Sequence, residues 1–393
     1  MRDYVPFVNS ARDCEIFGEY YVDAQMVRVS VGRVDEVRSL SKTAKIWIDA
    51  GVDGLHNLNV KSTGQFWDIF KKYPHYESIA DPAFQSKPDK GVVETFVFAV
   101  LKHCAAARAD YVSVPQLPHV MGGERNKINR LMCEATATWA VQNRSQFRFI
   151  LPCIFTQQEQ INTKSIRTKK LKLVDDCLRL SVATGVWVVE SSLHDLDGAV
   201  TFEQRRFPKL IELHEELGSL LPKETMTIAG PYWGMNLVLW ARGLVKFAAI
   251  GLGNAYQYHI PGGPPPPPAN KRVALTALRR WAVASPDLKQ WIQKNLNERI
   301  SKTDPAHAQF LEVERLIERA MNSDDLGRRQ IARFYKEWFD KIASAPHSGR
   351  ALALYQDLSS AYVLGKTLTD LPKNEPGSRK PDRVARQLML NCL

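Results

Sequence analysis

Apolar residues are arranged along this chain as short runs separated by stretches with helical periodicity. Eight runs are rich in Val, Ile and Phe and lack a regular polar alternation, which is typical of strands covered on both faces of a parallel sheet. We expect strands at 4–8, 26–31, 45–49, 110–114, 147–155, 185–192, 225–230 and 247–251. Between most of them apolar residues recur every three or four positions, whereas little helix fits between the first two strands.

This alternation of strands and helices predicts the fold class. Eight strand–helix units in about 250 residues are the pattern of an α/β protein with a (β/α)8 barrel of the TIM type, which we place in residues 1–260. A doubly wound open sheet is the alternative, because it gives the same order of elements. In a barrel the residues that follow the strands meet at one rim, so they are the first candidates for a functional site.

A proline-rich segment divides the chain. Pro264–Pro268 are five consecutive prolines, which form a stiff polyproline II segment and cannot join the interior of a helix or a sheet. We expect a Gly/Pro linker at 261–270, with a ligand for a proline-binding partner protein as the alternative. Apolar stripes at helical spacing follow, the strongest between Ile331 and Ile342, and predict a C-terminal α-helical domain in 271–393. This domain is basic, with 22 Lys and Arg against 14 Asp and Glu.

Composition narrows the class of protein. With 45% hydrophobic residues the chain can bury a substantial core, while no apolar run reaches the roughly 18 residues of a membrane span and the N-terminus does not resemble a secretory signal. The six cysteines are scattered, without the spacing of a zinc site, so we expect reduced thiols in a cytoplasmic protein with no metal and no other cofactor. The 53 basic and 42 acidic residues leave a net charge of +11, which favours a polyanion such as DNA or RNA as partner.

Two basic clusters are the candidates for contacts with nucleic-acid phosphates. The segment 164–172 places five basic residues in nine, after the fifth strand. A second cluster lies beside the strong apolar stripe of the C-terminal region, where the alternative is an ordinary solvated helix face. The residues that we expect to make these contacts are Lys164, Arg167, Lys169, Lys170, Arg328, Arg329 and Arg333.

Two carboxylates that directly end apolar strands are the candidate catalytic residues. Asp49 lies within KIWIDAGVDGL, and Glu190 lies in the expected strand 185–192. A pair of carboxylates suits the cleavage of a glycosidic bond, because one stabilises or attacks an oxocarbenium-like centre and the other transfers protons. The alternative for Asp49 is a turn or a helix cap, and for Glu190 it is a buried salt bridge.

Other rim residues are candidates for holding a substrate. Gln116 and His119 follow the fourth strand, and an imidazole there can titrate near neutrality. Gly251, Gly253 and Asn254 follow the eighth strand, in either a phosphate-binding turn or a simple one.

Aromatic residues and a long polar segment are expected at the same rim. Tyr232 and Trp233 follow the seventh strand, where they either stack on a nucleobase or pack the rim. The segment 73–90 is polar and interrupted by prolines, which predicts a lid or substrate-contacting loop or, equally, a plain surface insertion.

The order of these stretches resembles the tRNA-guanine transglycosylase superfamily. IDAGVDG, with Asp49, is similar to that family's strand-end Asp and Ser-Gly-Gly turn, and the order of 149–160, a helix and 187–190 is similar to its central strand pair. TIAGPYWGMNLVLWARGLVKFAAIGLG is similar to its late Gly–helix–Gly–strand order. Two features depart from the family: its zinc-binding cysteines are absent, and the eighth strand, within AAIGLGNAY, has no acid where the family has its nucleophilic Asp.

The resemblance implies a (β/α)8 glycosyltransferase that exchanges a base in nucleic acid, one branch of the family inserting 7-deazaguanines into DNA. We therefore expect a transglycosylase or N-glycosidase with a purine or 7-deazapurine base as its small-molecule substrate. Asp49 and Glu190 would be its acid and nucleophile in an order that the sequence leaves open, and Gln116 and Asn254 would hydrogen-bond the base. A nucleic-acid- or partner-binding module on a degenerate barrel without turnover is the alternative, and a small-molecule barrel enzyme is a third possibility.

Overall fold

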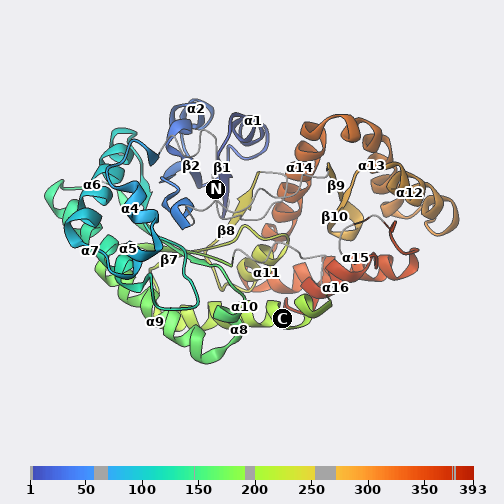
Figure 1. Ribbon diagram of the computed structural model, residues 1–393. Helices are drawn as coiled ribbons and strands as arrows, with labels where there is room; N and C mark the ends of the chain where they lie inside the picture. The colour runs from blue at the N-terminus through green and yellow to red at the C-terminus, as the bar shows by residue number, and fades with distance from the viewer. Residues whose placement is uncertain are drawn as a thin grey trace.

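The computed structural model describes residues 3–56, 70–145, 147–190, 200–252, 271–373, 375 and 378–393. Within these ranges the parallel strands β1 to β8 close into a barrel in sequence order (Figure 1). Their bounds are Tyr4–Val8 (β1), Met26–Ser30 (β2), Lys45–Asp49 (β3), Tyr111–Ser113 (β4), Arg148–Phe155 (β5), Gly185–Glu190 (β6), Met226–Ala229 (β7) and Phe247–Gly251 (β8). The predicted (β/α)8 barrel is confirmed, and every strand lies inside the range expected for it.

The pairing of β1 with β8 closes the sheet. Tyr4 lies opposite Ala248 and Phe7 lies opposite Gly251, which excludes the open doubly wound alternative. All neighbouring strands of the barrel are parallel, so their carboxyl ends share one rim.

Helices cover the outside of the barrel. They are α1 (Ala11–Tyr20), α2 (Val34–Leu40), α4 (Tyr76–Ala80), α5 (Pro82–Ser86), α6 (Lys90–Ala106), α7 (Asn126–Gln142), α8 (Glu159–Asn162), α9 (Lys164–Leu180), α10 (Val200–Leu220) and α11 (Met235–Ala241), with 3-10 turns η1 (Val31–Arg33) and η2 (Val52–His56). The helix α1 occupies the stretch where the sequence predicted little helix. It begins with a capping box, in which Ser10 Oγ accepts from the Asp13 N–H and the Asp13 carboxylate accepts from the Ser10 N–H.

The segment 73–90, which was expected to be a loop, contains α4 and α5. Asp81 caps α5 by accepting a hydrogen bond from the Ala83 N–H at 2.9 Å, and Pro82 occupies the first turn. The proline that interrupts the pattern therefore starts a helix. Gln85, on α5, accepts a hydrogen bond from Arg125 at 2.7 Å, which ties this segment to the loop before α7.

Three aromatic rings fill the centre of the barrel. The rings of Phe7, Trp47 and Trp187 lie edge to face, with centroids 5.3 to 5.8 Å apart. The indole N–H groups are satisfied, because Trp47 donates to Ser113 Oγ at 2.9 Å and Trp187 donates to the Gly230 carbonyl at 2.6 Å. The interior is thus a packed core, so a substrate can bind only at the ends of the barrel.

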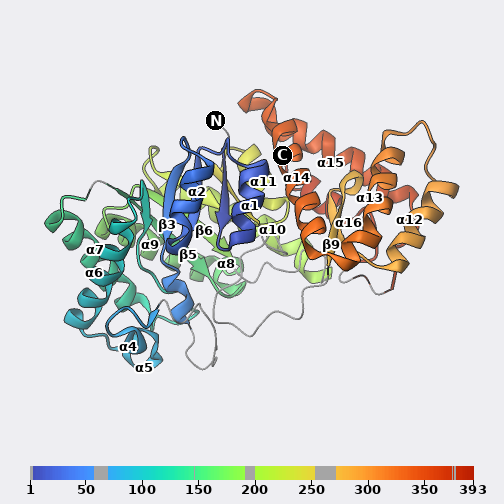
Figure 2. The same ribbon diagram turned by 90° about the horizontal axis from the view of Figure 1, so that it is seen from above.

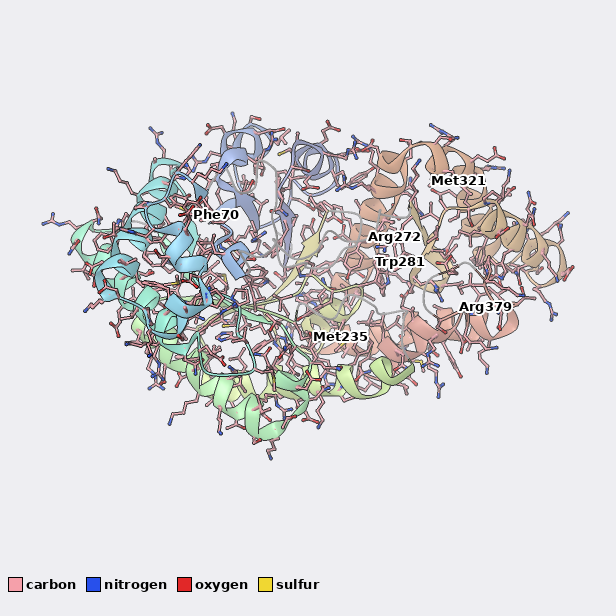
Figure 3. All side chains as sticks on the ribbon, viewed as in Figure 1. Phe70, Met235, Arg272, Trp281, Met321 and Arg379 are labelled. Atoms are coloured by element: carbon pink, nitrogen blue, oxygen red, sulfur yellow. The ribbon has the colours of Figure 1, made fainter. Side chains whose placement is uncertain are left out.

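The C-terminal part begins with a hairpin that the sequence did not predict. Its elements are β9 (Arg272–Leu275), η3 (Thr276–Leu278), β10 (Arg280–Val283), α12 (Pro286–Glu298), α13 (Pro305–Asn322), α14 (Asp324–Ala343), η4 (His347–Gly349), α15 (Arg350–Thr367) and α16 (Arg383–Met389). The strands β9 and β10 pair antiparallel. The guanidinium of Arg272 lies 3.9 Å from the ring centroid of Trp281, and both residues are labelled in Figure 3. The predicted linker 261–270 lies outside the described residues.

Two hydrophobic cores hold the C-terminal part. The hairpin, α12 and α13 enclose a core of their own, which includes Leu288, Phe310 and Ile317. The helices α14, α15 and α16 bury their apolar faces in the core of the barrel instead, beside α1 and α11 (Figure 2). Phe339 of α14 shows this sharing, since its ring lies 4.2 Å from that of Trp240 and 5.1 Å from that of Tyr4.

All six cysteines are buried free thiols, as expected. Among the helices in the described ranges, none combines the length and the apolar character that crossing a bilayer requires.

Candidate functional site

Asp49 ends β3 at the carboxyl rim and is held by a buried ion pair. Arg28 Nε donates to Asp49 Oδ2 at 2.8 Å, and Arg28 Nη2 contacts the same oxygen. The other carboxylate oxygen accepts a hydrogen bond from the Gly51 N–H at 2.9 Å. Because Gly51 has a φ of 70°, a left-handed value that glycine adopts readily, the chain can turn back so that its amide meets the carboxylate. The Asp49 side chain is therefore fixed in one orientation.

Arg28 lies in an aromatic box inside the barrel. Its guanidinium carbon is 4.5 Å from the ring centroid of Phe7, 5.0 Å from that of Trp187 and 5.9 Å from that of Trp47. These ring faces stabilise a cation through their quadrupoles, and Asp49 supplies the opposing charge. Arg28 Nη1 also donates to Asn9 Oδ1 at 3.3 Å, so the pair is joined to the end of β1.

Asp53 is the second buried carboxyl group of this rim. It lies in the turn η2 with 4% of its surface exposed, and within the described ranges its Oδ2 has no hydrogen-bond partner. Burial raises its pKa, and the negative charge of Asp49 raises it further, to about 7. Arg28 opposes this rise only in part. Asp53 consequently keeps its proton up to about neutral pH, whereas Asp49 lies in an ion pair with Arg28.

A small cavity borders both carboxyl groups. Its volume is about 10 Å³. Its lining includes Asp49, Asp53, Ser113, Gln116 and Pro152. This volume corresponds to about one water molecule. The described part of the rim therefore brings together a carboxylate that is ion-paired with Arg28, a carboxyl group with a raised pKa and a small polar space.

A chain of polar contacts joins this rim to α14. The Asn9 N–H donates to Asp13 Oδ2 at 3.0 Å, and Arg328 Nη2 lies 3.3 Å from Asp13 Oδ1. The same guanidinium nitrogen donates to the Leu252 carbonyl, just after β8, at 3.3 Å. The C-terminal part is thus connected to the carboxyl ends of both β1 and β8.

Glu190, the second predicted catalytic carboxylate, lies at the end of β6. Trp187 faces the barrel centre, so strand alternation places Glu190, three residues on, on the opposite face of the strand. The Glu190 N–H donates to Tyr232 Oη at 2.8 Å. Asp49, by contrast, shares the inward face of its strand with Trp47. The catalytic role of Glu190 stays a prediction.

Tyr232 and Trp233 are both about 1% exposed. The Trp233 ring lies against Phe334 and Tyr335 of α14, with centroids 6.2 and 5.5 Å away, and its indole donates to the Arg279 carbonyl at 2.9 Å. Of the two alternatives that the sequence left open, packing describes these residues. Trp233 joins the barrel to the C-terminal part and does not present a free ring at the rim.

The side chains of Gln116 and His119 make contacts within the protein that hold the loop after β4. The Gln116 side-chain amide donates to the Asn129 carbonyl at 3.0 Å and to the Pro115 carbonyl at 2.8 Å. The His119 ring stacks on Phe155 at 5.4 Å. Burial, with help from nearby cations, lowers the His119 pKa to about 3, so the expectation that this imidazole titrates near neutrality is wrong.

The basic cluster on α9 contains both buried and exposed side chains. Arg167 is 1% exposed and its guanidinium binds Glu212 and Glu216 of α10 at 2.8 and 2.6 Å. Lys170 donates to the Val120 and Gly122 carbonyls at 2.6 and 2.9 Å. These two side chains bind the protein and not phosphate, whereas Lys164 and Lys169 are exposed and stay candidates.

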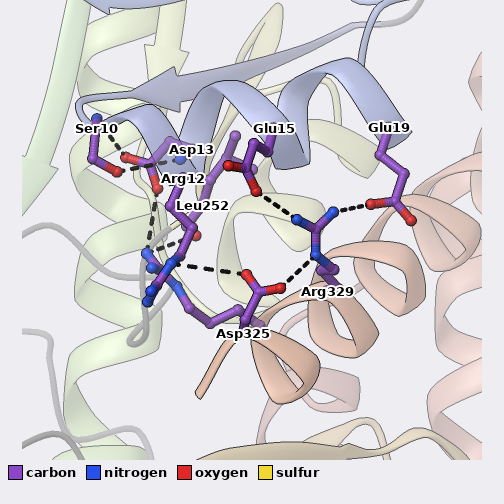
Figure 4. Close-up of polar contacts among 9 residues, drawn as sticks. Ser10, Arg12, Asp13, Glu15, Glu19, Leu252, Asp325 and Arg329 are labelled. Atoms are coloured by element: carbon purple, nitrogen blue, oxygen red, sulfur yellow. Dashed lines mark hydrogen bonds and ion pairs between the residues drawn. The ribbon is translucent and has the colours of Figure 1, made fainter. Parts of the chain in front are cut away.

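The arginines of α14 form an ion-pair network with α1 (Figure 4). Arg329 binds Glu15 at 2.6 Å, Asp325 at 2.7 Å and also Glu19. Arg333 pairs with Glu312, and Arg328 pairs with Asp13 as described above. The basic edge that the sequence suggested for nucleic-acid binding is therefore largely used in docking α14 onto the barrel.

The remaining candidates lie at the end of β8. Gly251 is the last residue of that strand, whereas Gly253 and Asn254 lie outside the described residues. Across the described ranges, no group of three or more His, Cys, Asp and Glu residues has a geometry that could hold a metal ion.

Sequence reasoning missed Arg28 and Asp53. Arg28 is the single charged residue in the otherwise apolar strand MVRVS, and a lone charge in a strand buried on both faces needs a partner. Asp53 is the second acid of DAGVD, four residues after Asp49. Each signal was visible in the printed sequence, but only the barrel shows that the three side chains meet.

Comparison with known proteins leaves the chemistry open. No protein-family model and no curated protein matches the chain. Among solved structures, the carboxyl transferase domain of Rhizobium etli pyruvate carboxylase with pyruvate has 12% identity and a TM-score of 0.39, covering 92% of this chain and 54% of that one. A probable tagatose 6 phosphate kinase from Sinorhizobium meliloti 1021 has 12% identity and a TM-score of 0.36, covering 99% and 100%. Triosephosphate isomerase from Bartonella henselae has 12% identity and a TM-score of 0.31, covering 65% and 94%.

The chain thus spans about half the length of the carboxyl transferase structure, at 54%. Similarity this low carries no argument about substrate or reaction.

Proposed function

We propose that the protein is an enzyme that exchanges or removes a base at an N-glycosidic bond of DNA or RNA, as a transglycosylase or N-glycosidase. The reaction takes place at the carboxyl end of the barrel. The observation that carries the proposal is the pair Asp49 and Asp53, two buried acids at one rim, of which Asp49 is ion-paired with Arg28 and Asp53 has a raised pKa. Neighbouring carboxyl groups whose environments separate their protonation states are the usual basis of acid–base assignment in an active site.

The two groups supply complementary chemistry. When the bond between a sugar and a base breaks, positive charge develops on the sugar and negative charge on the departing base. Asp53 keeps its proton up to about pH 7 and gives it to the leaving base as general acid. Asp49, oriented by Arg28 and the Gly51 N–H, stabilises the developing positive charge. Arg28 is a positioning residue in this scheme.

The choice of nucleic acid as substrate rests on two sequence features. IDAGVDG, which contains both acids, resembles the strand-end motif of the tRNA-guanine transglycosylase superfamily, and the chain carries a net charge of +11. No acid lies on β8, which reads FAAIG. A covalent exchange would therefore need Asp49 or Glu190 as nucleophile, whereas base removal needs only water.

The test is a labelled-base assay on both polymers. The protein is incubated with labelled guanine or 7-deazaguanine and with DNA or RNA, and label in the acid-precipitable fraction is counted, while base release is followed by chromatography. Asp53→Asn removes the acidic proton with little change in shape. Asp370→Asn, at an exposed surface pair with Lys380, is the matched control.

Incorporation or release that Asp53→Asn abolishes and Asp370→Asn retains supports the proposal and identifies the polymer. If the wild-type protein neither incorporates nor releases a base, yet binds nucleic acid in a salt-sensitive manner, the barrel is a binding module without turnover.

A further inference from the structure

A wide groove lies at the other end of the barrel from the carboxyl rim. It has a volume of about 960 Å³ and opens where β3, β4 and β5 begin and where α6 and α7 end. Its lining includes five basic side chains and one acidic one: Lys45, Lys102, Arg108, Arg144, Arg148 and Asp110. A concave surface with charge of one sign concentrates the field and attracts counter-ions.

Most of this positive charge is not neutralised by the protein. Lys45 pairs with Asp110 at 3.2 Å. The other four side chains, Lys102, Arg108, Arg144 and Arg148, are exposed and make no ion pair with any residue in the described ranges. The arginines of α14 differ in this respect, because Arg329 alone has three acidic partners. The groove therefore contains basic side chains without acidic partners, whereas most of the residues in the two predicted basic clusters already bind groups of the protein.

Two of these arginines have an unusual, left-handed backbone conformation. Arg108 and Arg144 follow the ends of α6 and α7 with φ values of 55° and 44°. This left-handed position after a helix is usually taken by glycine or asparagine, because other side chains are strained there. The chain carries an arginine at both positions, and both line the same groove.

A second groove, of about 840 Å³, adjoins the first. The two share Tyr111 and Arg148. The second is balanced in charge, since its lining holds two basic residues, Arg148 and Arg179, and two acidic ones, Asp175 and Glu224. Arg179 pairs with Asp175. The two together form an extended depression with its positive charge at one end, which suits a polymer better than a compact ligand.

We propose that the first groove binds the phosphodiester backbone of a polynucleotide. Guanidinium groups match phosphate oxygens in pairs, and four cations without acidic partners provide four phosphate contacts. This site lies at the amino ends of the strands and is separate from the rim that carries Asp49 and Asp53. It holds a nucleic acid apart from the reaction site, and it does so whether or not that rim exchanges bases.

The test is binding of fluorescein-labelled single-stranded DNA, single-stranded RNA and duplex DNA, followed by anisotropy between 50 and 300 mM KCl. The groove variant is Arg144→Gln/Arg148→Gln. The matched control is Arg299→Gln/Arg386→Gln, which removes the same charge at two exposed sites, one just after α12 and one on α16. Circular dichroism checks that each variant is folded.

For a single strand, four phosphate contacts predict a slope of log affinity against log salt of about −3, and the groove variant should halve it. We expect this variant to bind at least about tenfold more weakly at 100 mM KCl, while the control stays within about twofold of the wild-type protein. A bound oligonucleotide should also protect Lys102 from acetylation, as read by mass spectrometry.

Three outcomes would overturn the proposal. The groove variant could bind as tightly as the wild-type protein, the control could lose as much affinity as the groove variant, or the wild-type protein could bind anionic phospholipid vesicles and none of the oligonucleotides. The assay needs no turnover, so its failure is distinct from a failure of the labelled-base test.

Discussion

The negative charge of Asp49 raises the pKa of Asp53, the acid four residues later on the same turn of the barrel rim. Burial is the larger cause of the rise, and Arg28 offsets it only in part. The arrangement separates the roles of two similar side chains, since Asp49 is oriented by the Arg28 guanidinium and Asp53 is kept protonated to about pH 7.

The buried pair of Arg28 and Asp49 should be costly to break from one side. Asp49→Asn leaves a guanidinium without its counter-charge inside the barrel, and we expect it to lower the free energy of unfolding by about 3–5 kcal/mol. The double variant Arg28→Leu/Asp49→Leu removes both charges and should lose less than the single one. Urea denaturation at pH 7 measures both. A double variant less stable than Asp49→Asn would contradict this account of the pair.

Asp53 should make the fold less stable as pH rises. Its pKa is about 7 in the folded protein and near 3.9 in the unfolded chain, so between these values the folded state binds more protons. Its contribution to the free energy of unfolding is therefore present below about pH 4 and falls by up to about 1.4 kcal/mol per pH unit until pH 7.

Asp53→Asn removes this dependence and should be more stable than the wild-type protein at pH 8 but similar to it at pH 4.5. Urea denaturation at the two pH values tests this. Equal pH dependence in the two proteins would show that Asp53 ionises normally.

His119 should remain neutral throughout the physiological range. Burial lowers its pKa to about 3, because the charged imidazolium would lose its hydration beside Lys170 and Arg125. Proton NMR should show a ring resonance that does not shift between pH 8 and pH 5, assigned by its loss in His119→Phe. A midpoint near 6.5 would show instead that the ring is solvated.

Docking of α14 should depend on Phe339. Its buried ring packs between Trp240 and Tyr4 of the barrel, so Phe339→Ala should lower the free energy of unfolding by about 3–5 kcal/mol. Val363 on α15 is 59% exposed, and Val363→Ala should change stability by no more than about 0.5 kcal/mol. Similar losses in the two variants would mean that α14 does not share the core of the barrel.

The barrel could be predicted from sequence because each of its strands is a short apolar run, which is the pattern of a strand buried on both faces. The stretch 147–155, for example, contains β5 and has one buried face against the core and one against helices. The helix α1 was missed because its start depends on a hydrogen-bonded pair, Ser10 and Asp13, and not on periodicity. The hairpin of β9 and β10 was missed for a similar reason: each strand has only four residues.

The site was only partly predictable. Asp49 could be found because a strand ends at it, but the partner that fixes it lies 21 residues earlier, on β2. Charge alone misjudged Arg167 and Arg329, because sequence shows that a side chain is basic and not whether an acid from another helix already binds it. Only the folded structure shows which ion-pair partners, distant in the sequence, lie beside each of these side chains.

The most direct measurement of the central claim is the pH profile of base exchange or release between pH 5 and pH 9, in the wild-type protein and in Asp53→Asn. If Asp53 is the general acid, kcat/KM of the wild-type protein should be constant at low pH and fall tenfold per pH unit above about pH 7 as the proton is lost. Asp53→Asn should then be inactive at every pH. A variant that retains activity, or a wild-type profile with no fall above pH 7, would contradict the assignment of Asp53 as the proton donor.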